Sequence, residues 1–210
     1  CAVRDRHLLL GNADLRITFV RAAEPSVLYR NAVGDECVFV ASGVGIVQTV
    51  FGPLAYRAGD YVLLPRATTH RWLPSEPSEL YCIEANSHIN PPKRYLSRFG
   101  QLLEHAPYCE RDLHGPSDLA TMDLAQMNAE VAFDEPAQIY IKHRARGRDG
   151  GIGGSVVTVA THPFDVVGWD GCLYPYTLNI DDYMPITGKV HQPPPVHQVF
   201  EGHNFVICNF

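Results

Sequence analysis

The sequence predicts an all-β protein, a barrel of antiparallel strands, from two observations. Short apolar runs of strand length recur between residues 15 and 90, and turn residues separate them. The runs are Ile17–Val20, Cys37–Val40, Ile46–Val50, Tyr61–Leu64 and Leu80–Ile83. The turn signals are Gly34-Asp35, Ser42-Gly43, Gly52-Pro53 and Gly59-Asp60, because glycine tolerates positive φ and proline presets a turn-like φ. Pro65 is expected to end a strand, since it has no amide hydrogen for the ladder.

The spacing of residues 36 to 70 resembles the two-part signature of the cupin barrel. Its first part reads His-x-His, three or four residues, Glu, six residues, Gly. Its second part reads Gly, five residues, Pro-x-Gly, two residues, His. The matching positions are Glu36, Gly43, Gly59, Pro65 and His70, with Ala67 in the place of the last glycine. Upstream of Glu36, where the signature has two further histidines, stand Tyr29, Arg30, Asn31 and Ala32. Two of four metal ligands are present, so we expect a barrel that holds no metal.

Three regions follow from the change of pattern along the chain. Residues 15–90 are predicted to form a metal-degenerate cupin-like β domain. Residues 91–136 are predicted to be an ordered connector with a short helix, because apolar residues from Tyr95 to Leu103 recur three and four apart. Residues 137–210 are predicted to begin a second β domain that is truncated, with strands at Ile139–Lys142, Ser155–Ala160 and Phe205–Cys208. The basic positions Lys142, Arg144, Arg146 and Arg148 suggest a solvated hairpin.

Composition excludes several classes of partner. A net charge of -6 gives no electrostatic reason to expect nucleic acid. The sequence has no apolar run of about 20 residues, the length that a membrane-crossing helix requires. The six cysteines form no Cys-x-x-Cys pair, which favours reduced thiols in a cytoplasmic protein over disulfides or a zinc site.

His191, His197 and His203 recur at a spacing of six residues, which invites comparison with a metal site. Pro193-Pro194-Pro195 forces extended or turn geometry between the first two, so a chelate there needs a sharp bend. Glu201 is the one nearby carboxylate. The alternatives are polar histidines at a cavity mouth, or a catalytic imidazole that the loop supplies to a metal held elsewhere. We favour the catalytic imidazole.

Four longer segments resemble the bacterial branch of the homogentisate 1,2-dioxygenases. They are residues 92–95, 108–116, 161–176 and 191–197. The resemblance implies a two-domain bicupin, in which this chain supplies the first barrel, the connector and part of the second barrel. It also implies that the complete enzyme uses Fe(II) as its cofactor, cleaves an aromatic ring with O2 and forms a homo-oligomer.

In that family two histidines and a glutamate hold the iron, after a Pro-Tyr-Tyr-His motif that this chain does not contain. The resemblance therefore implies an internal fragment without metal ligands of its own. It implies a proton-transfer histidine in the loop at His191 or His197, and both are retained as catalytic candidates.

The first hypothesis is thus a fragment of a homogentisate-cleaving dioxygenase of aromatic amino-acid catabolism, with a small aromatic substrate and O2 as partners. It is an enzyme by family resemblance. The alternative is a non-enzymatic cupin-like protein that binds a small molecule or serves as an oligomer scaffold. A third hypothesis is a cupin with its own metal, held by Glu36, His70 and part of the cluster at 191–203.

Overall fold

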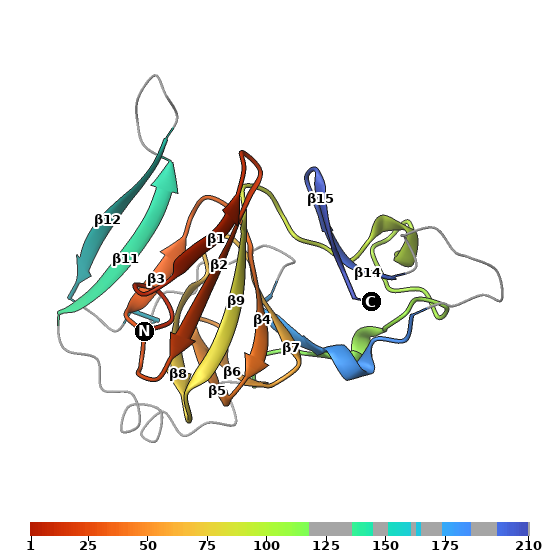
Figure 1. The fold of residues 1–210 in the computed structure, drawn as a ribbon, viewed down its shortest axis with the longest axis horizontal. Helices are drawn as coiled ribbons and strands as arrows, with labels where there is room; N and C mark the ends of the chain where they lie inside the picture. The colour runs from red at the N-terminus through yellow and green to blue at the C-terminus, as the bar shows by residue number, and fades with distance from the viewer. Residues whose placement is uncertain (118–135, 145–150, 161–162, 165–173, 186–196, 210) are drawn as a thin grey trace.

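The fold is all-β, as the sequence predicts, and cupin-like (Figure 1). The computed structural model describes residues 1–117, 136–144, 151–160, 163–164, 174–185 and 197–209. The strands of the first region are β1 (His7–Gly11), β2 (Leu15–Ala22), β3 (Leu28–Asn31), β4 (Glu36–Ser42), β5 (Val44–Thr49), β6 (Gly52–Arg57), β7 (Asp60–Leu64), β8 (Thr69–Pro74) and β9 (Ser78–Ala85). Later strands are β10 (Leu113–His114), β11 (Ala137–Arg144), β12 (Ile152–Val159), β13 (Tyr176–Asn179), β14 (Gln198–Gly202) and β15 (Phe205–Cys208).

Two large sheets face each other and enclose the barrel interior (Figure 1). The seven-stranded sheet has the order β1-β2-β9-β4-β7-β13-β10, and the six-stranded sheet has the order β12-β11-β3-β8-β5-β6. The pairing is antiparallel except between β11 and β3, which run parallel. β14 and β15 form a separate hairpin on the side of the molecule opposite β11 and β12 (Figure 1).

Apolar side chains fill one part of the space between the sheets. This cluster comprises Ala2, Val20, Ala22, Val38, Val40, Val47, Leu54, Tyr56, Val62, Leu64, Trp72, Leu80 and Cys82. A second cluster lies on the other face of the seven-stranded sheet, where Leu63 and Leu178 meet Tyr95 and Tyr108 of the connector and Phe200 of β14. Burial of these aromatic rings fixes the connector and the hairpin against the barrel.

Every strand predicted from residues 15–90 is present, and so are the three predicted later in the chain. Gly43 and Gly59 occupy turns with φ of 96° and 87°, which side chains other than glycine rarely adopt. β7 ends at Leu64, directly before Pro65. The expected turn at Gly52-Pro53 is instead the start of β6. The strands without a strong alternating pattern, such as β1, β3 and β8, were not predicted.

The described part of the connector contains two 3-10 turns, η1 (Lys93–Tyr95) and η2 (Glu110–Asp112). Leu96 and Leu102 form an isolated β-bridge, so the apolar spacing expected for a helix belongs here to a compact loop. A third 3-10 turn, η4 (Ile180–Asp182), follows β13.

The predicted division at residues 90 and 136 stays a prediction, although strands from beyond residue 137 join both sheets of the barrel. β11 pairs with β3, and β13 pairs with β7. In the described ranges no helix is long and apolar enough to cross a membrane. The five described cysteines, Cys1, Cys37, Cys82, Cys109 and Cys208, are free thiols.

Candidate functional site

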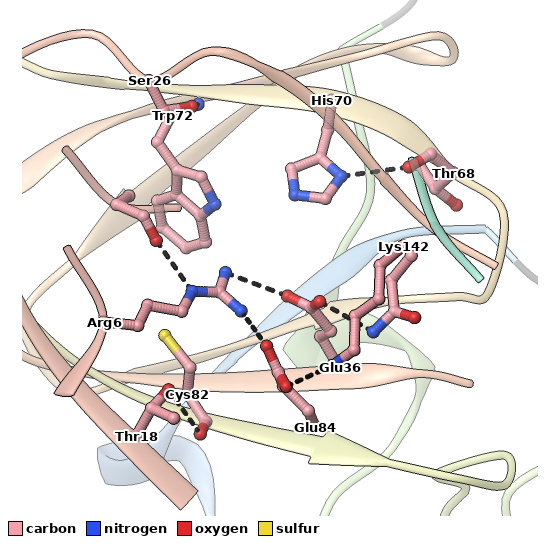
Figure 2. Close-up of polar contacts among 12 residues, drawn as sticks. Arg6, Thr18, Ser26, Glu36, Thr68, His70, Trp72, Cys82, Glu84 and Lys142 are labelled. Carbon is pink, nitrogen blue, oxygen red and sulfur yellow. Dashed lines mark hydrogen bonds and ion pairs between the residues drawn. The ribbon is translucent and has the colours of Figure 1, made fainter. Parts of the chain in front are cut away.

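The two signature residues that could hold a metal, Glu36 and His70, both lie inside the barrel. Glu36 opens β4 and His70 stands on β8, and each is 1% exposed. Figure 2 shows both side chains directed into the interior from opposite walls. The two residues that match the motif are therefore both residues of the barrel interior.

A buried arginine lies against the Glu36 carboxylate. Arg6 Nη2 lies 3.1 Å from Glu36 Oε2, and the amide of Asn31 donates to Glu36 Oε1 at 2.9 Å. The Arg6 Nε also donates to the carbonyl of Ala2 at 2.8 Å, which holds the side chain in place. Both carboxylate oxygens of Glu36 thus have partners from the chain itself.

A second carboxylate, Glu84 of β9, stands directly across the ladder from Glu36. Two like charges at such a position repel each other. Arg6 relieves this repulsion because it pairs with both carboxylates. Its Nη1 lies 2.6 Å from Glu84 Oε1, and its Nη2 pairs with Glu36. Lys142 of β11 adds a further cation 2.5 Å from Glu84 Oε2. We call these four residues the ionic network; they alternate in charge as two cations and two anions.

The ionic network sets the protonation states in the barrel interior. Burial alone would raise the pKa of Glu36, but the Arg6 guanidinium and neighbouring donors lower it to about 2. Burial lowers the pKa of His70, which favours the neutral imidazole. The pKa of Arg6 is raised despite burial, because Cys82, Glu36 and Glu84 favour its charged form. The interior therefore holds an ionised carboxylate at Glu36 and a neutral imidazole at His70.

Two buried ring nitrogens have no partner among the described residues. Nδ1 of His70 lies 3.0 Å from the carbonyl of Thr68, whereas its Nε2 has no partner. Nε1 of Trp72 is the other such atom in the interior, and both rings point to the same space in Figure 2. Buried polar atoms of this kind usually bind an ordered water.

The barrel residues do not fit an iron site. A metal on Glu36 would have to displace Arg6, the cation that already neutralises this carboxylate. Two ligands also fall short of the three that a two-His-one-carboxylate face requires. Within the described ranges no group of three or more His, Cys, Asp or Glu residues is arranged to hold a metal.

Of the two catalytic candidates the structure describes His197, which lies away from the barrel interior. His191 is outside the described residues. His197 is half-buried directly before β14, where its carbonyl accepts from the amide of Asn209 at 2.8 Å. His203 is exposed in the turn at the opposite end of the same hairpin. The structure therefore does not bring His197 and His203 together, nor either of them to Glu36 and His70.

A cavity of about 400 Å³ is lined by residues of the barrel, the connector and β14. Tyr176 of β13 lines it, and the buried hydroxyl of this residue has no partner among the described residues. Glu201 lines it from β14 and is held by backbone hydrogen bonds to Asn90 at 2.8 and 2.9 Å. This volume lies in the range of small-molecule sites.

Sequence reasoning missed Arg6, Glu84 and Lys142. Arg6 precedes the first strand and matches no motif, so nothing in its neighbourhood marks it as buried. Lys142 was grouped with a solvated basic hairpin, but its side chain is 15% exposed and turns inward to Glu84. The one available signal was Glu84, a carboxylate at an inward position of an alternating strand.

The chain is similar to a curated protein over almost its whole length. It is 38% identical over 208 residues to "Putative dioxygenase SSO1533" of Saccharolobus solfataricus, which covers 98% of this chain and 50% of that protein. The chain thus spans about half the length of the curated relative. No family model matches the chain.

Solved structures of cupins are more distant. A cupin 2 conserved barrel domain protein from Leptotrichia buccalis is 12% identical, with a TM-score of 0.37, over 83% of this chain and 82% of that one. Bacillus subtilis oxalate decarboxylase is 14% identical, with a TM-score of 0.38, over 88% of this chain and 49% of that one. Similarities this low add no argument about function.

Proposed function

We propose that this chain is part of a cupin-type, iron(II)-dependent dioxygenase that cleaves the ring of homogentisate to maleylacetoacetate. The observation that carries the proposal is the 38% identity to a protein named as a dioxygenase, over 98% of the chain. The homogentisate-dioxygenase-like segments supply the substrate class. On this proposal the partners are a small aromatic substrate and O2, and the whole protein is a cytoplasmic homo-oligomer.

The ionic network supports a division of labour within such an enzyme. Arg6 neutralises the one signature carboxylate of the barrel, so the barrel serves as a frame and the iron ligands come from other residues. His191 and His197 are then the candidates for a general base that hydrogen-bonds a phenolic hydroxyl and accepts its proton. The cavity beside β14 lies in the same part of the fold as His197.

The test compares the 210-residue chain with the intact natural protein, whose mass is first measured by mass spectrometry. Each receives iron(II) anaerobically, then homogentisate and O2, and oxygen uptake and absorbance of the ring-opened product are followed. We expect turnover by the intact protein and none by the 210-residue chain alone. Phenylacetate, which lacks both hydroxyls, serves as the control substrate.

Absence of turnover by the iron-loaded intact protein would contradict the proposed reaction. Robust turnover by the 210-residue chain would contradict the placement of the iron ligands instead. Replacing His191 or His197 with Gln in the intact protein then identifies the base, which should lose about 100-fold or more in kcat. Loss from neither variant would exclude both histidines.

The ionic network also favours a second candidate, a non-enzymatic cupin-like scaffold. A barrel interior held by Arg6, Glu36, Glu84 and Lys142 needs no metal for its structure. Elemental analysis before and after His70→Ala tests the barrel itself: we expect the same metal content in both proteins. A loss of metal on replacing His70 would restore the third hypothesis, a cupin with its own metal.

A further inference from the structure

A groove of about 450 Å³ opens at the edge of the barrel where the two sheets diverge. One wall consists of the N-terminal segment with β1 and β2, and the other consists of the β11–β12 hairpin (Figure 1). The floor is formed by Tyr29, Glu84 and the inner part of the ionic network. A site of this size accommodates a small organic molecule.

Positive charge is concentrated in this groove although the protein as a whole is acidic. Four cationic side chains line it, and Glu84 is the one anionic residue in the lining. The cations are Arg4, Arg6, Arg16 and Lys142. Even when Glu36 behind Arg6 is counted, cations exceed anions by two, so the local field favours an anion.

The cations divide into an inner and an outer pair. Arg6 and Lys142 turn inward, with side chains that are 7% and 15% exposed, and both form ion pairs with Glu84. Arg4 donates to the hydroxyl of Tyr140 and lies 4.5 Å from the centre of that ring. Arg16 is exposed and stands across the ladder from Glu84, whose two oxygens already bind Arg6 and Lys142. Arg16 therefore carries a positive charge that forms no ion pair with a carboxylate of the described residues.

The position of Arg16 on β2 directs it to the groove. It shares the inward face of the strand with Thr18 and Val20, which are buried, and it stands at the open end of that face. Arg21, on the same strand, is also exposed but has the opposite parity and does not line the groove. Arg16 and Arg21 thus carry the same side chain on the same strand, but only Arg16 lines the groove.

Apolar surface completes the groove. Leu8, Val27, Ile141 and Val156 line it, together with the rings of Tyr29 and Tyr140. Leu8 and Val156 are 56% and 51% exposed, so apolar area at the rim lies open to solvent. A ligand that covers these residues gains burial while its charged end meets the arginines.

We propose that this groove binds a small monocarboxylate with an apolar or aromatic body, whose carboxylate pairs with Arg16. The planar guanidinium suits a carboxylate because it can donate two parallel hydrogen bonds. The body of the ligand packs against Tyr29, Ile141 and Val156. The inference goes beyond the proposed dioxygenase reaction and does not depend on it, because the groove contains none of the proposed catalytic histidines.

The probe is benzoate, and benzamide is its uncharged control of the same shape. Binding is measured with the 210-residue chain by calorimetry and by amide chemical shifts, at low and at high salt. We expect benzoate to bind at least about 10-fold more tightly than benzamide, with affinity falling as salt rises. The shifts should concentrate on β1, β2, β11 and β12.

The matched variants are Arg16→Gln and Arg21→Gln, which remove the same charge from the same strand. We expect Arg16→Gln to weaken benzoate binding about 10-fold, with benzamide unaffected, and Arg21→Gln to change neither. Circular dichroism verifies that both variants fold. Equal affinity for benzoate and benzamide, equal effects of the two substitutions, or shifts located outside the groove would each overturn the proposal. So would no detectable binding of benzoate.

Discussion

The barrel interior has two halves of opposite chemistry, and the same strands build both. On β4 the inward residues change from Glu36 to Val38 and Val40, and on β9 from Glu84 to Cys82 and Leu80. These strands are paired, so charge lies opposite charge and apolar lies opposite apolar. Across the barrel, β8 changes from His70 to Trp72.

The difference shows that two kinds of interaction, burial of apolar side chains and pairing of buried charges, can stabilise neighbouring parts of the same strands. The apolar half is stabilised by burial of side chains such as Leu80 and Trp72, which needs no particular partner. The ionic half is stable only while every charge keeps its partner, because an unpaired buried charge is costly. Substitutions in the two halves should therefore differ in magnitude, in pH dependence and in how they combine.

Arg6→Met should have the largest effect of the substitutions considered. It leaves Glu36 and Glu84 facing each other in the interior without the cation between them, which should cost about 3–5 kcal/mol of unfolding free energy. Urea denaturation measures the loss. The triple variant with Glu36→Gln and Glu84→Gln should recover part of it, since the charges then disappear together. If the triple variant were less stable than Arg6→Met, charge imbalance would not be the cause.

Leu80→Ala tests the apolar half at a position that is 0% exposed. The cavity and the lost burial should cost about 3 kcal/mol. Unlike the loss in Arg6→Met, this loss should stay the same between pH 7 and pH 4 when measured by urea denaturation. A strong pH dependence of the Leu80→Ala loss would mean that the two halves are not independent.

Acid should weaken the ionic half in two stages. The lowered pKa of Glu36, about 2 against an ordinary 4.5, contributes stability that is present above pH 4.5 and lost between pH 4.5 and 2. The lowered pKa of neutral His70 adds a loss that begins as pH falls through its ordinary 6.5, because the unfolded state then binds the proton more readily. The effect should be smaller than that of Arg6→Met, because protonation removes the charge of Glu36, whereas the substitution leaves both carboxylates without the cation between them.

Urea midpoints as a function of pH measure this titration. His70→Gln should flatten the curve just below pH 6.5, and Glu36→Gln should flatten it between pH 4.5 and 2. A wild-type curve that is already flat across both windows would contradict the assigned protonation states.

Ala67→Gly should give the smallest effect, and it should be stabilising. Ala67 stands where the cupin signature has glycine, and it keeps a φ of 69°. That conformation costs alanine about 1 kcal/mol, which glycine recovers. Asn204→Gly is the matched control, because Asn204 has a φ of 63° and asparagine tolerates this region. Thermal melting should show a higher Tm for Ala67→Gly than for Asn204→Gly.

The sequence was sufficient for the apolar half and for the turns at Gly43 and Gly59. Alternation at Val38 and Val40, and glycine at positions 43 and 59, are local signals that act within a strand or a turn. The cupin-like spacing singles out Glu36 and His70, and both side chains are buried inside the barrel. The expectation that the barrel holds no metal rested on the two histidines of the cupin signature that are missing upstream of Glu36. For the chain as a whole, the absence of a metal stays a prediction.

The ionic network could not be predicted, because its members come from distant parts of the chain. Arg6, Glu84 and Lys142 meet only when β9 and β11 and the segment before β1 are in place. No spacing rule connects such positions, and Lys142 lies in a basic run that by itself indicates a solvated surface. Charge pairing of this kind is a property of the folded barrel and not of any local segment.

The order of strands in the seven-stranded sheet has a consequence for biosynthesis. Among the described residues β10 is joined to the sheet through β13, which lies much later in the chain and pairs with β7 on its other side. During translation, Leu113 and His114 therefore leave the ribosome before the strand that will attach them exists. The hydrogen-bonding edge of β7 stays open over that interval, so this margin of the sheet is completed late and is exposed to mispairing in nascent chains.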